Sequence, residues 1–388
     1  MKRRCLALVL LSATALLAGI SSCISVPRIP ARGIIAGYPL SGPVDSEVAR
    51  DYLEGRRLPS GIEEVRQRYL ASEEVPSREA LATVSSRYSP DVATLLFLET
   101  LSALPEIRDL RQRYEAELSY VHRVGVERAR PDIPDSLLVL MVPGWFYVAH
   151  GAETNSDYAI QRRLLDRWGI AHVLVPIQEN GTIEGNARIV ADAVRQASRG
   201  HRVFLVSASK SGAEVALALG RELSASEAES VVGWLSIVGV VRGSPLADRV
   251  LEPDLCWLAK LKLGLEGFDL EGAKSMQTSR ARSAFEQLRF PPHVHAFAYM
   301  AVPLSGNISG RGSFGYARMR ELGPNDGLTL LADELIPHAV PLLVPGVDHF
   351  LGPGDQELWS TAVFRLFAAE VARDAGVDVR TQNSTGNR

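Results

Sequence analysis

The chain has 388 residues and a formal net charge of −3, with 46% hydrophobic and 22% charged residues. This composition is that of an ordinary globular protein. A charge this close to neutral is not typical of nucleic-acid-binding chains, so we expect no nucleic-acid partner.

The N-terminus carries an export signal. Met1–Arg4 is cationic and Leu6–Leu17 is an apolar run too short to span a bilayer, which indicates a secretory signal. Ile20-Ser21-Ser22-Cys23 follows and resembles the lipobox of bacterial lipoproteins. The resemblance implies that residues 1–22 are removed and that Cys23 carries fatty acyl chains such as palmitate, which would hold the protein on a membrane. The alternative is an ordinary cleaved signal with an incidental cysteine.

No aspartate follows Cys23, and by the sorting rule of Gram-negative lipoproteins this favours the outer membrane, if the host has one. Loss of the signal would remove Cys5 and leave a mature chain with a charge near −6. Since Cys23 would carry lipid, Cys256 is alone and no intramolecular disulfide is expected. Stability must then come from a packed core.

Three segments are expected before the main domain. Residues 23–43, with four prolines, predict a lipidated cysteine and an extended tether. Residues 44–130 show apolar spacing typical of helices, as at Val92, Leu95 and Leu98, and predict a region of about four helices. Pro131–Asp135 marks a boundary.

Residues 131–375 alternate between apolar strands and amphipathic helices, which predicts an α/β fold with a mostly parallel sheet flanked by helices. Residues 250–290 interrupt this pattern and predict an inserted helical cap. Its apolar side chains would pack on the sheet or, as a second possibility, line an acyl pocket. Residues 376–388 are expected to be disordered. The strands are expected at 137–142, 172–177, 203–206, 231–238, 294–302 and 340–345, and the helices at 157–168, 184–199, 213–223 and 356–374.

A sharp turn is expected between the strand at 203–206 and the next helix, at Ser207-Ala208-Ser209-Lys210-Ser211. A nucleophile elbow needs small residues two positions before and after its serine. Ser209 meets this requirement directly after the strand, while Ser211 offers a second frame. We expect the Lys210 side chain to be solvated rather than catalytic.

Pro143-Gly144-Trp145-Phe146 follows the first strand of the sheet and resembles an oxyanion loop. The backbone N–H groups of Trp145 and Lys210 are the expected oxyanion donors. The alternative is a plain turn with Trp145 in the core.

An acid and a base follow in the remaining loops. Asp326 lies in an Asn-Asp-Gly turn after the strand at 294–302, and His349 follows the last strand on a loop that contains glycine. Asp348 and Asp333 are rival acids. The order Ser209, Asp326, His349 matches the Ser-Asp/Glu-His order of one hydrolase fold.

Together these residues resemble the α/β-hydrolase superfamily over about 135–375. Val238–Asp248, Asn325–Gly327 and Asp348–Phe350 resemble stretches of bacterial triacylglycerol lipases in particular. The resemblance implies a serine hydrolase that cleaves acyl esters or lipids through a Ser-His-Asp triad and an acyl-enzyme. Serines at 207 and 211 stand where that family usually has glycine.

Two other functions fit the same residues. One is a thioesterase, amidase or peptidase that uses this triad, and the other is a non-catalytic envelope lipoprotein. The non-catalytic lipoprotein predicts no reaction with a fluorophosphonate, whereas the enzymes predict labelling of their serine. Neither paired metal-ligand spacing nor a nucleotide-binding glycine loop occurs, so we expect no cofactor.

Overall fold

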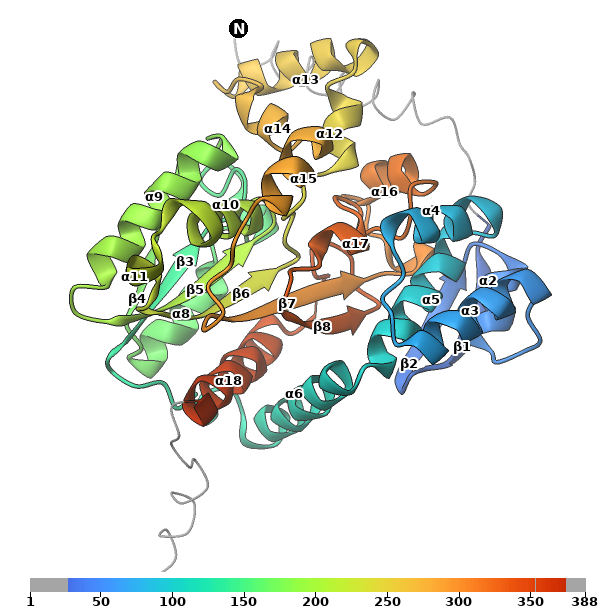
Figure 1. Cartoon of the computed structure of the whole chain (residues 1–388), viewed down its shortest axis with the longest axis horizontal. Coiled ribbons are helices and arrows are strands. Elements are labelled where there is room, and N and C mark those ends of the chain that lie inside the picture. Colours follow the sequence, from blue (N-terminus) through green and yellow to red (C-terminus); the bar gives the residue numbers. More distant parts are fainter. Residues whose placement is uncertain (1–26, 353, 375–388) are drawn as a thin grey trace, which may run out of the picture.

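The computed structural model describes residues 27–352 and 354–374. The predicted signal, Cys23 and the C-terminal tail lie outside the described residues. Elements are labelled as in Figure 1.

A six-stranded sheet of order β4-β3-β5-β6-β7-β8 lies at the centre of the molecule, and all its neighbouring strands are parallel. Strands β5 and β6 are buried almost throughout, as their continuous apolar sequences require. The predicted fold class is thus confirmed. The strands are β3 (Leu137–Val142), β4 (His172–Leu174), β5 (Arg202–Ala208), β6 (Val231–Ile237), β7 (His295–Val302) and β8 (Val340–Pro345).

Helices cover both faces of the sheet (Figure 1). Helices α9 and α10 pack on one face, and α6, α8 and α18 pack on the other. Helix α9 begins after the N-cap Thr182 and turns its apolar side, including Val190 and Val194, into the core. The bounds are α6 (Pro105–Val124), α8 (Ala159–Trp168), α9 (Ile183–Ala197), α10 (Ser211–Leu217) and α18 (Gln356–Asp374), with short helices α7 (Gly151–Thr154), α11 (Ala225–Ala228), α16 (Ser313–Met319) and α17 (Leu331–Glu334) between strands.

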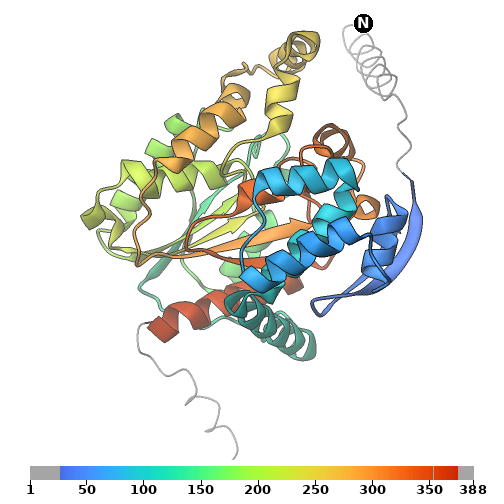
Figure 2. The ribbon, with the colours of Figure 1, turned by 45° about the vertical axis from the view of Figure 1, so that its right-hand side comes forward.

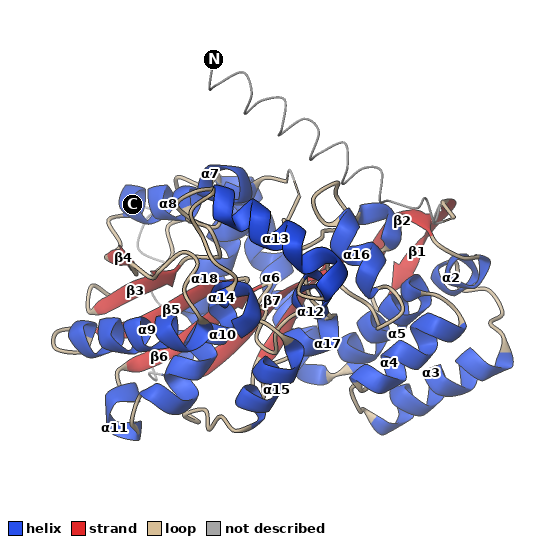
Figure 3. Ribbon diagram, turned by 90° about the horizontal axis from the view of Figure 1, so that it is seen from above, coloured by secondary structure: helices blue, strands red, loops and turns tan. Residues whose placement is uncertain are grey.

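The cap consists of α12 (Pro245–Val250), α13 (Pro253–Leu265), α14 (Glu271–Ser275) and α15 (Thr278–Glu286). It stands above the sheet at the top of Figure 1, and Figure 3 shows α13 from above. Helix α13 buries only Leu263 and leaves Trp257, Leu261 and Leu265 more than half exposed. The cap therefore packs through α14 and α15 rather than through α13.

The predicted tether is wrong for residues 29–43. They belong to an antiparallel hairpin of β1 (Ile29–Ile35) and β2 (Tyr38–Val44), which lies at the edge of the molecule in Figure 2. Ala36 and Gly37 both have positive φ, as a tight hairpin turn requires. In a two-stranded ribbon each strand has a free edge, so prolines without an N–H group are tolerated there.

Residues 44–130 are helical, as predicted, but form five helices. Helix α5 is buried nearly all round and begins at Pro90 after the N-cap Ser89. The first four are α2 (Glu47–Leu53), α3 (Ser60–Ser72), α4 (Arg78–Arg87) and α5 (Pro90–Ala103), and α6 is the fifth.

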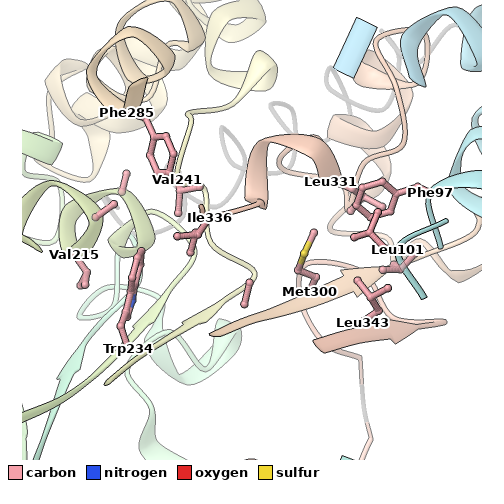
Figure 4. Packing of buried hydrophobic residues seen from close by; sticks show 14 of the residues in the cluster. Phe97, Leu101, Val215, Trp234, Val241, Phe285, Met300, Leu331, Ile336 and Leu343 are labelled. Carbon is pink, nitrogen blue, oxygen red and sulfur yellow. The ribbon is translucent and has the colours of Figure 1, made fainter. Parts of the chain in front are cut away.

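One apolar cluster joins these helices to the sheet. Phe97 and Leu101 of α5 lie beside Leu331, Met300 and Leu343 (Figure 4). Within the described ranges, no helix is both long and apolar enough to cross a bilayer.

Candidate active site

Ser209 lies in a strained turn at the carboxyl end of β5. Its φ is +57°, in the left-handed region that residues other than glycine rarely adopt. Its N–H donates to Ile237 O (3.0 Å), and its C=O accepts from the N–H groups of Gly212 and Val240 (3.0 and 2.9 Å). These hydrogen bonds fix the turn against the end of β6 and so maintain the strained backbone conformation of Ser209.

Close packing of backbone explains the small residues around this turn. A Cβ atom on Gly212 would come within 2.9 Å of Gly239 Cα, and one on Gly239 within 2.1 Å of Ser236 Oγ. Residues 207 and 211 are serines, and both are fully buried. Ser211 Oγ lies 2.8 Å from Val142 O and 2.9 Å from both the N and O atoms of Ala208. Ser207 Oγ accepts from Trp234 Nε1 (2.8 Å).

The burial of Ser211 decides between the two frames that the sequence allowed. Ser211 has no exposed surface and is bonded to backbone, while Ser209 is partly exposed beside a cavity. Of these two serines, only Ser209 reaches the cavity.

The three predicted side chains meet. Ser209 Oγ and His349 Nε2 are 2.9 Å apart, and His349 Nδ1 lies 2.5 Å from Asp326 Oδ2. Asp326 is fully buried, and its Oδ1 accepts from the N–H groups of Leu328 and Thr329, both at 2.8 Å. Since Asp326 also accepts His349 N–H through its C=O (2.9 Å), the acid turn and the histidine loop are fixed to each other.

Neither rival acid occupies this position. Asp348 accepts from the N–H groups of Ser309 and Phe350 (2.7 and 3.1 Å). Asp333 is fully buried between Arg78 of α4 and Arg282 of α15, each at 2.7 Å. Asp348 therefore stabilises the loop around His349, and Asp333 joins the helical region to the cap.

Residues 238–248 are hydrogen-bonded to the turn that contains Asp326. Ser244 Oγ donates to Leu328 O, and Thr329 Oγ1 donates to Gly243 O (2.9 Å). Near this turn, burial raises the pKa of Glu334 well above its ordinary value. The Asp326 charge acts in the same direction, so the neutral form of Glu334, which adds no second negative charge near Asp326, is favoured.

In the loop after β3, the amides on either side of Trp145 are bonded, while that of Trp145 has no acceptor within the described part of the chain. Gly144 N–H donates to Ser156 O (2.9 Å) and Phe146 N–H to Glu179 O (3.3 Å). Among the described residues, the N–H groups of Trp145 and Lys210 donate to no protein acceptor. The Trp145 indole is bonded to Asn180 Oδ1 (3.1 Å), which fixes the loop. These are the two amides that the sequence suggested as oxyanion donors, and Trp145 lines the cavity beside Ser209.

The predicted solvation of the Lys210 side chain is wrong. Its ammonium is buried and pairs with Glu214, one helical turn later. Asn186 Nδ2 of α9 also donates to Glu214 (2.8 Å). Burial raises the pKa of Glu214 and the Lys210 charge opposes that rise. The spacing of four residues is visible in the sequence, but the burial of the pair against Asn186 of α9 is not.

Several residues around Ser209 were not predicted. They line one cavity with Ser209 and His349, and most come from the carboxyl edge of the sheet and the loops beyond it, with others from α8 and α18. Six of the nine described non-glycine residues with positive φ lie there, and such strain concentrates at functional sites. Among these six residues, only Asn155, directly after a short helix, is of a type that favours the left-handed conformation. The others are Phe146, Thr154, Ser156, Tyr158, Gln161, Ile237, Val238, Leu328, Phe350, Leu351, Gln356 and Trp359.

No group of His, Cys, Asp and Glu among the described residues could hold a metal ion. The chemistry that these side chains can perform is proton transfer and nucleophilic attack.

Comparisons with known proteins identify the fold. No protein-family model and no curated protein matches the sequence. The crystal structure of a metagenomic carboxyl esterase matches 68% of this chain and 92% of its own, with a TM-score of 0.53 and 19% identity. The mature lipase BlEst2 of Bacillus licheniformis matches 62% of this chain and 94% of its own, with a TM-score of 0.48 and 21% identity. At these identities the likeness is one of fold, and the fold is that of the α/β-hydrolases.

Proposed function

We propose that this chain is a serine hydrolase that cleaves carboxylic acyl esters. The observation that supports the proposal is the hydrogen-bonded series Ser209, His349 and Asp326, built from three separate loops at one edge of the sheet. Next to it, the free N–H groups of Trp145 and Lys210 suit a developing oxyanion.

The reaction has two halves. His349 Nε2 takes the proton of Ser209 Oγ as that oxygen attacks the ester carbon, while Asp326 holds Nδ1–H and favours the imidazolium. The tetrahedral intermediate collapses, His349 returns the proton to the leaving alcohol, and the acyl group stays on Ser209. Water, activated by His349, then releases the acid.

A fluorophosphonate probe and a p-nitrophenyl ester test this proposal. Ser209→Ala should abolish labelling, and His349→Ala should reduce kcat by about 10⁴-fold or more. Ser211→Ala is the matched control and should remain labelled. Lack of labelling and turnover in the folded wild-type protein would favour the non-catalytic envelope protein instead.

We also infer that the enzyme is held on a membrane through lipid on Cys23. Since the hairpin begins at Ile29, only five residues separate it from Cys23, and their reach is roughly 20 Å. The domain would therefore sit close to the bilayer. Incorporation of labelled palmitate that is lost in Cys23→Ser would support this anchor, and palmitate-free wild-type protein in the soluble fraction would exclude it.

A further inference from the structure

One buried asparagine is hydrogen-bonded toward both proposed oxyanion donors. Asn186 has no exposed surface and lies in the first turn of α9, which packs beside α10 on one face of the sheet (Figure 1). Its amide uses both ends, since the nitrogen donates two hydrogen bonds and the oxygen accepts one. Asn186 does not line the cavity beside Ser209, so any role in the reaction depends on what these bonds hold.

The first of these bonds leads to the amide of Lys210. Asn186 Nδ2 donates to Glu214 Oε1 (2.8 Å), and the same oxygen is paired with the buried Lys210 ammonium. Among the described residues, the Glu214 carboxylate has no other hydrogen-bond partner. Lys210 is the N-cap residue of α10, so its ammonium is held one helical turn beyond its own backbone. A shift of the Lys210 amide would therefore stretch a buried ion pair.

The other two bonds lead to the turn that follows β4. Asn186 Oδ1 accepts from the N–H of Gln178 (3.1 Å), and the second Nδ2–H donates to the C=O of the same residue (2.9 Å). The turn is tight around this amide, because a Cβ atom on Gly181 would come within 2.6 Å of Asn186 Oδ1. Asn186 thus fixes the main chain at 178–181.

This turn holds the loop that carries the second donor. Four hydrogen bonds from residues 145–149 end on Glu179 and Asn180. The N–H of Phe146 donates to Glu179 O (3.3 Å), and two further N–H groups of the loop donate to Glu179 Oε2 (3.2 and 2.9 Å). The Trp145 indole donates to Asn180 Oδ1 (3.1 Å). The backbone amide of Trp145 is therefore placed by its own side chain and by the amide that follows it.

We propose that Asn186 is a positioning residue of the oxyanion hole, which sets the amides of Lys210 and Trp145 relative to each other. Two donors stabilise an oxyanion only if both reach it at about 2.7–3.1 Å, and a misplacement of about 1 Å can cost about 100-fold in rate. This inference rests on the proposed ester hydrolysis at Ser209 and adds to it a residue outside the cavity.

Steady-state kinetics and a transition-state analogue test this role. Asn186→Ala should reduce kcat for a p-nitrophenyl ester by about 10-fold or more and leave KM within about threefold, because the oxyanion forms only after the substrate has bound. An alkyl trifluoromethyl ketone forms an adduct with the serine that places an oxyanion in the hole. Its inhibition constant should rise by a similar factor. Val190→Ala, one turn further along α9 and fully buried, is the control for lost stability and should keep the wild-type kcat and inhibition constant.

Glu179→Ala is a second variant, at a half-buried site, and it decides the question if Asn186→Ala does not fold. It removes the acceptor of two loop amides and should lower kcat and ketone affinity by about threefold or more. Wild-type kcat and ketone affinity in either folded variant would overturn the inference and leave ester hydrolysis intact. A fall in kcat without a matching loss of ketone affinity would also overturn it. Absence of labelling and turnover in the wild-type protein would instead contradict the proposed function.

Discussion

Ser207 and Ser211, which flank Ser209, each carry a hydroxyl group. In an elbow with glycines at these two positions, only hydrogen atoms would stand there. Ser211 Oγ connects the turn at Ala208 to Val142, the last residue of β3. The free amide of Trp145 follows that strand by three residues, and the amide of Lys210 directly precedes Ser211. The Ser211 hydroxyl thus fixes the two proposed oxyanion donors relative to each other.

Ser211→Ala should lower stability and turnover together. Loss of the hydroxyl leaves Ala208 N–H without an acceptor, which costs about 1–3 kcal/mol in the free energy of unfolding. A small shift of the turn should reduce kcat by roughly 10-fold, with Ser209 still labelled. Urea unfolding and steady-state kinetics measure both effects. Unchanged kcat would show that Ser211 does not position the turn.

The buried pair of Lys210 and Glu214 gives a second prediction. Lys210→Met should cost about 3–5 kcal/mol, because it leaves the Glu214 carboxylate in an apolar surrounding without its counterion. The double variant Lys210→Met with Glu214→Leu should recover most of that loss. Urea unfolding of the four proteins in this cycle measures the coupling. A cost below about 1 kcal/mol for the single variant would show that the pair is solvated.

For single residues, the sequence predicted which loops carry the candidate site. It did not predict which partners the neighbouring charged side chains, such as Lys210 and Asp333, would have. Ser209, Asp326 and His349 could be found because each follows a strand, and parallel strands end at one edge. The burial of Lys210 depends on Asn186 of α9, and Asp333 is occupied by arginines from α4 and α15. Such contacts follow from packing, which has no local signature in the sequence.

Between elements, two aspartates join the hairpin to the sheet. Asp45, after β2, and Asp91, at the start of α5, each accept the other's backbone N–H (3.3 and 2.8 Å). Asp91 also accepts from the N–H and hydroxyl of Ser305, which follows β7 (2.7 and 2.6 Å). Burial, and then the Asp45 charge, raise the pKa of Asp91 to about 7.

This raised pKa makes stability depend on pH. An unfolded aspartate has a pKa of about 3.9, so between about pH 4 and pH 7 the folded protein holds a proton that the unfolded chain releases. The contribution of this group to the free energy of unfolding is therefore full below about pH 4 and is lost as the pH rises through 7.

Asp45→Asn should weaken this dependence, because it removes the like charge and keeps an oxygen for Asp91 N–H. From about pH 4.5 to 7.5, the free energy of unfolding of the variant should rise relative to wild type by about 1 kcal/mol. Urea unfolding at the two pH values measures it, with the exposed Asp132→Asn as control. An equal pH dependence in wild type and Asp45→Asn would mean that the two carboxyl groups are not coupled.

Elements with one clear periodicity were predicted well. The strands at 137–142 and 340–345 match the structure at both ends, because their apolar runs are bounded by turn residues. The hairpin at 29–44 was missed because prolines suggested an irregular chain, although its alternation of buried and exposed residues is that of a half-buried strand. The strand expected at 172–177 is shorter, since it lies at the edge of the sheet.

At the scale of the whole molecule, the helical region and the sheet share their apolar interior. Leu101 of α5 is fully buried, in the same cluster as Met300 of β7 and Leu343 of β8 (Figure 4). Helix α6 packs on α18 and β8 on the other face. The boundary that Pro131–Asp135 suggests is thus a turn in the chain and does not separate two cores.

Leu101→Ala tests whether the two parts unfold as one unit. The substitution should cost about 2–5 kcal/mol, because it leaves a cavity in the shared core. All five tryptophans lie after residue 130, so their fluorescence reports on the sheet and cap alone. If unfolding is cooperative, the fluorescence midpoint in urea should shift as far as the midpoint seen by circular dichroism. Leu322→Ala, at a half-exposed site, is the control and should shift neither. A fluorescence midpoint that Leu101→Ala leaves in place would show that residues 44–130 unfold independently.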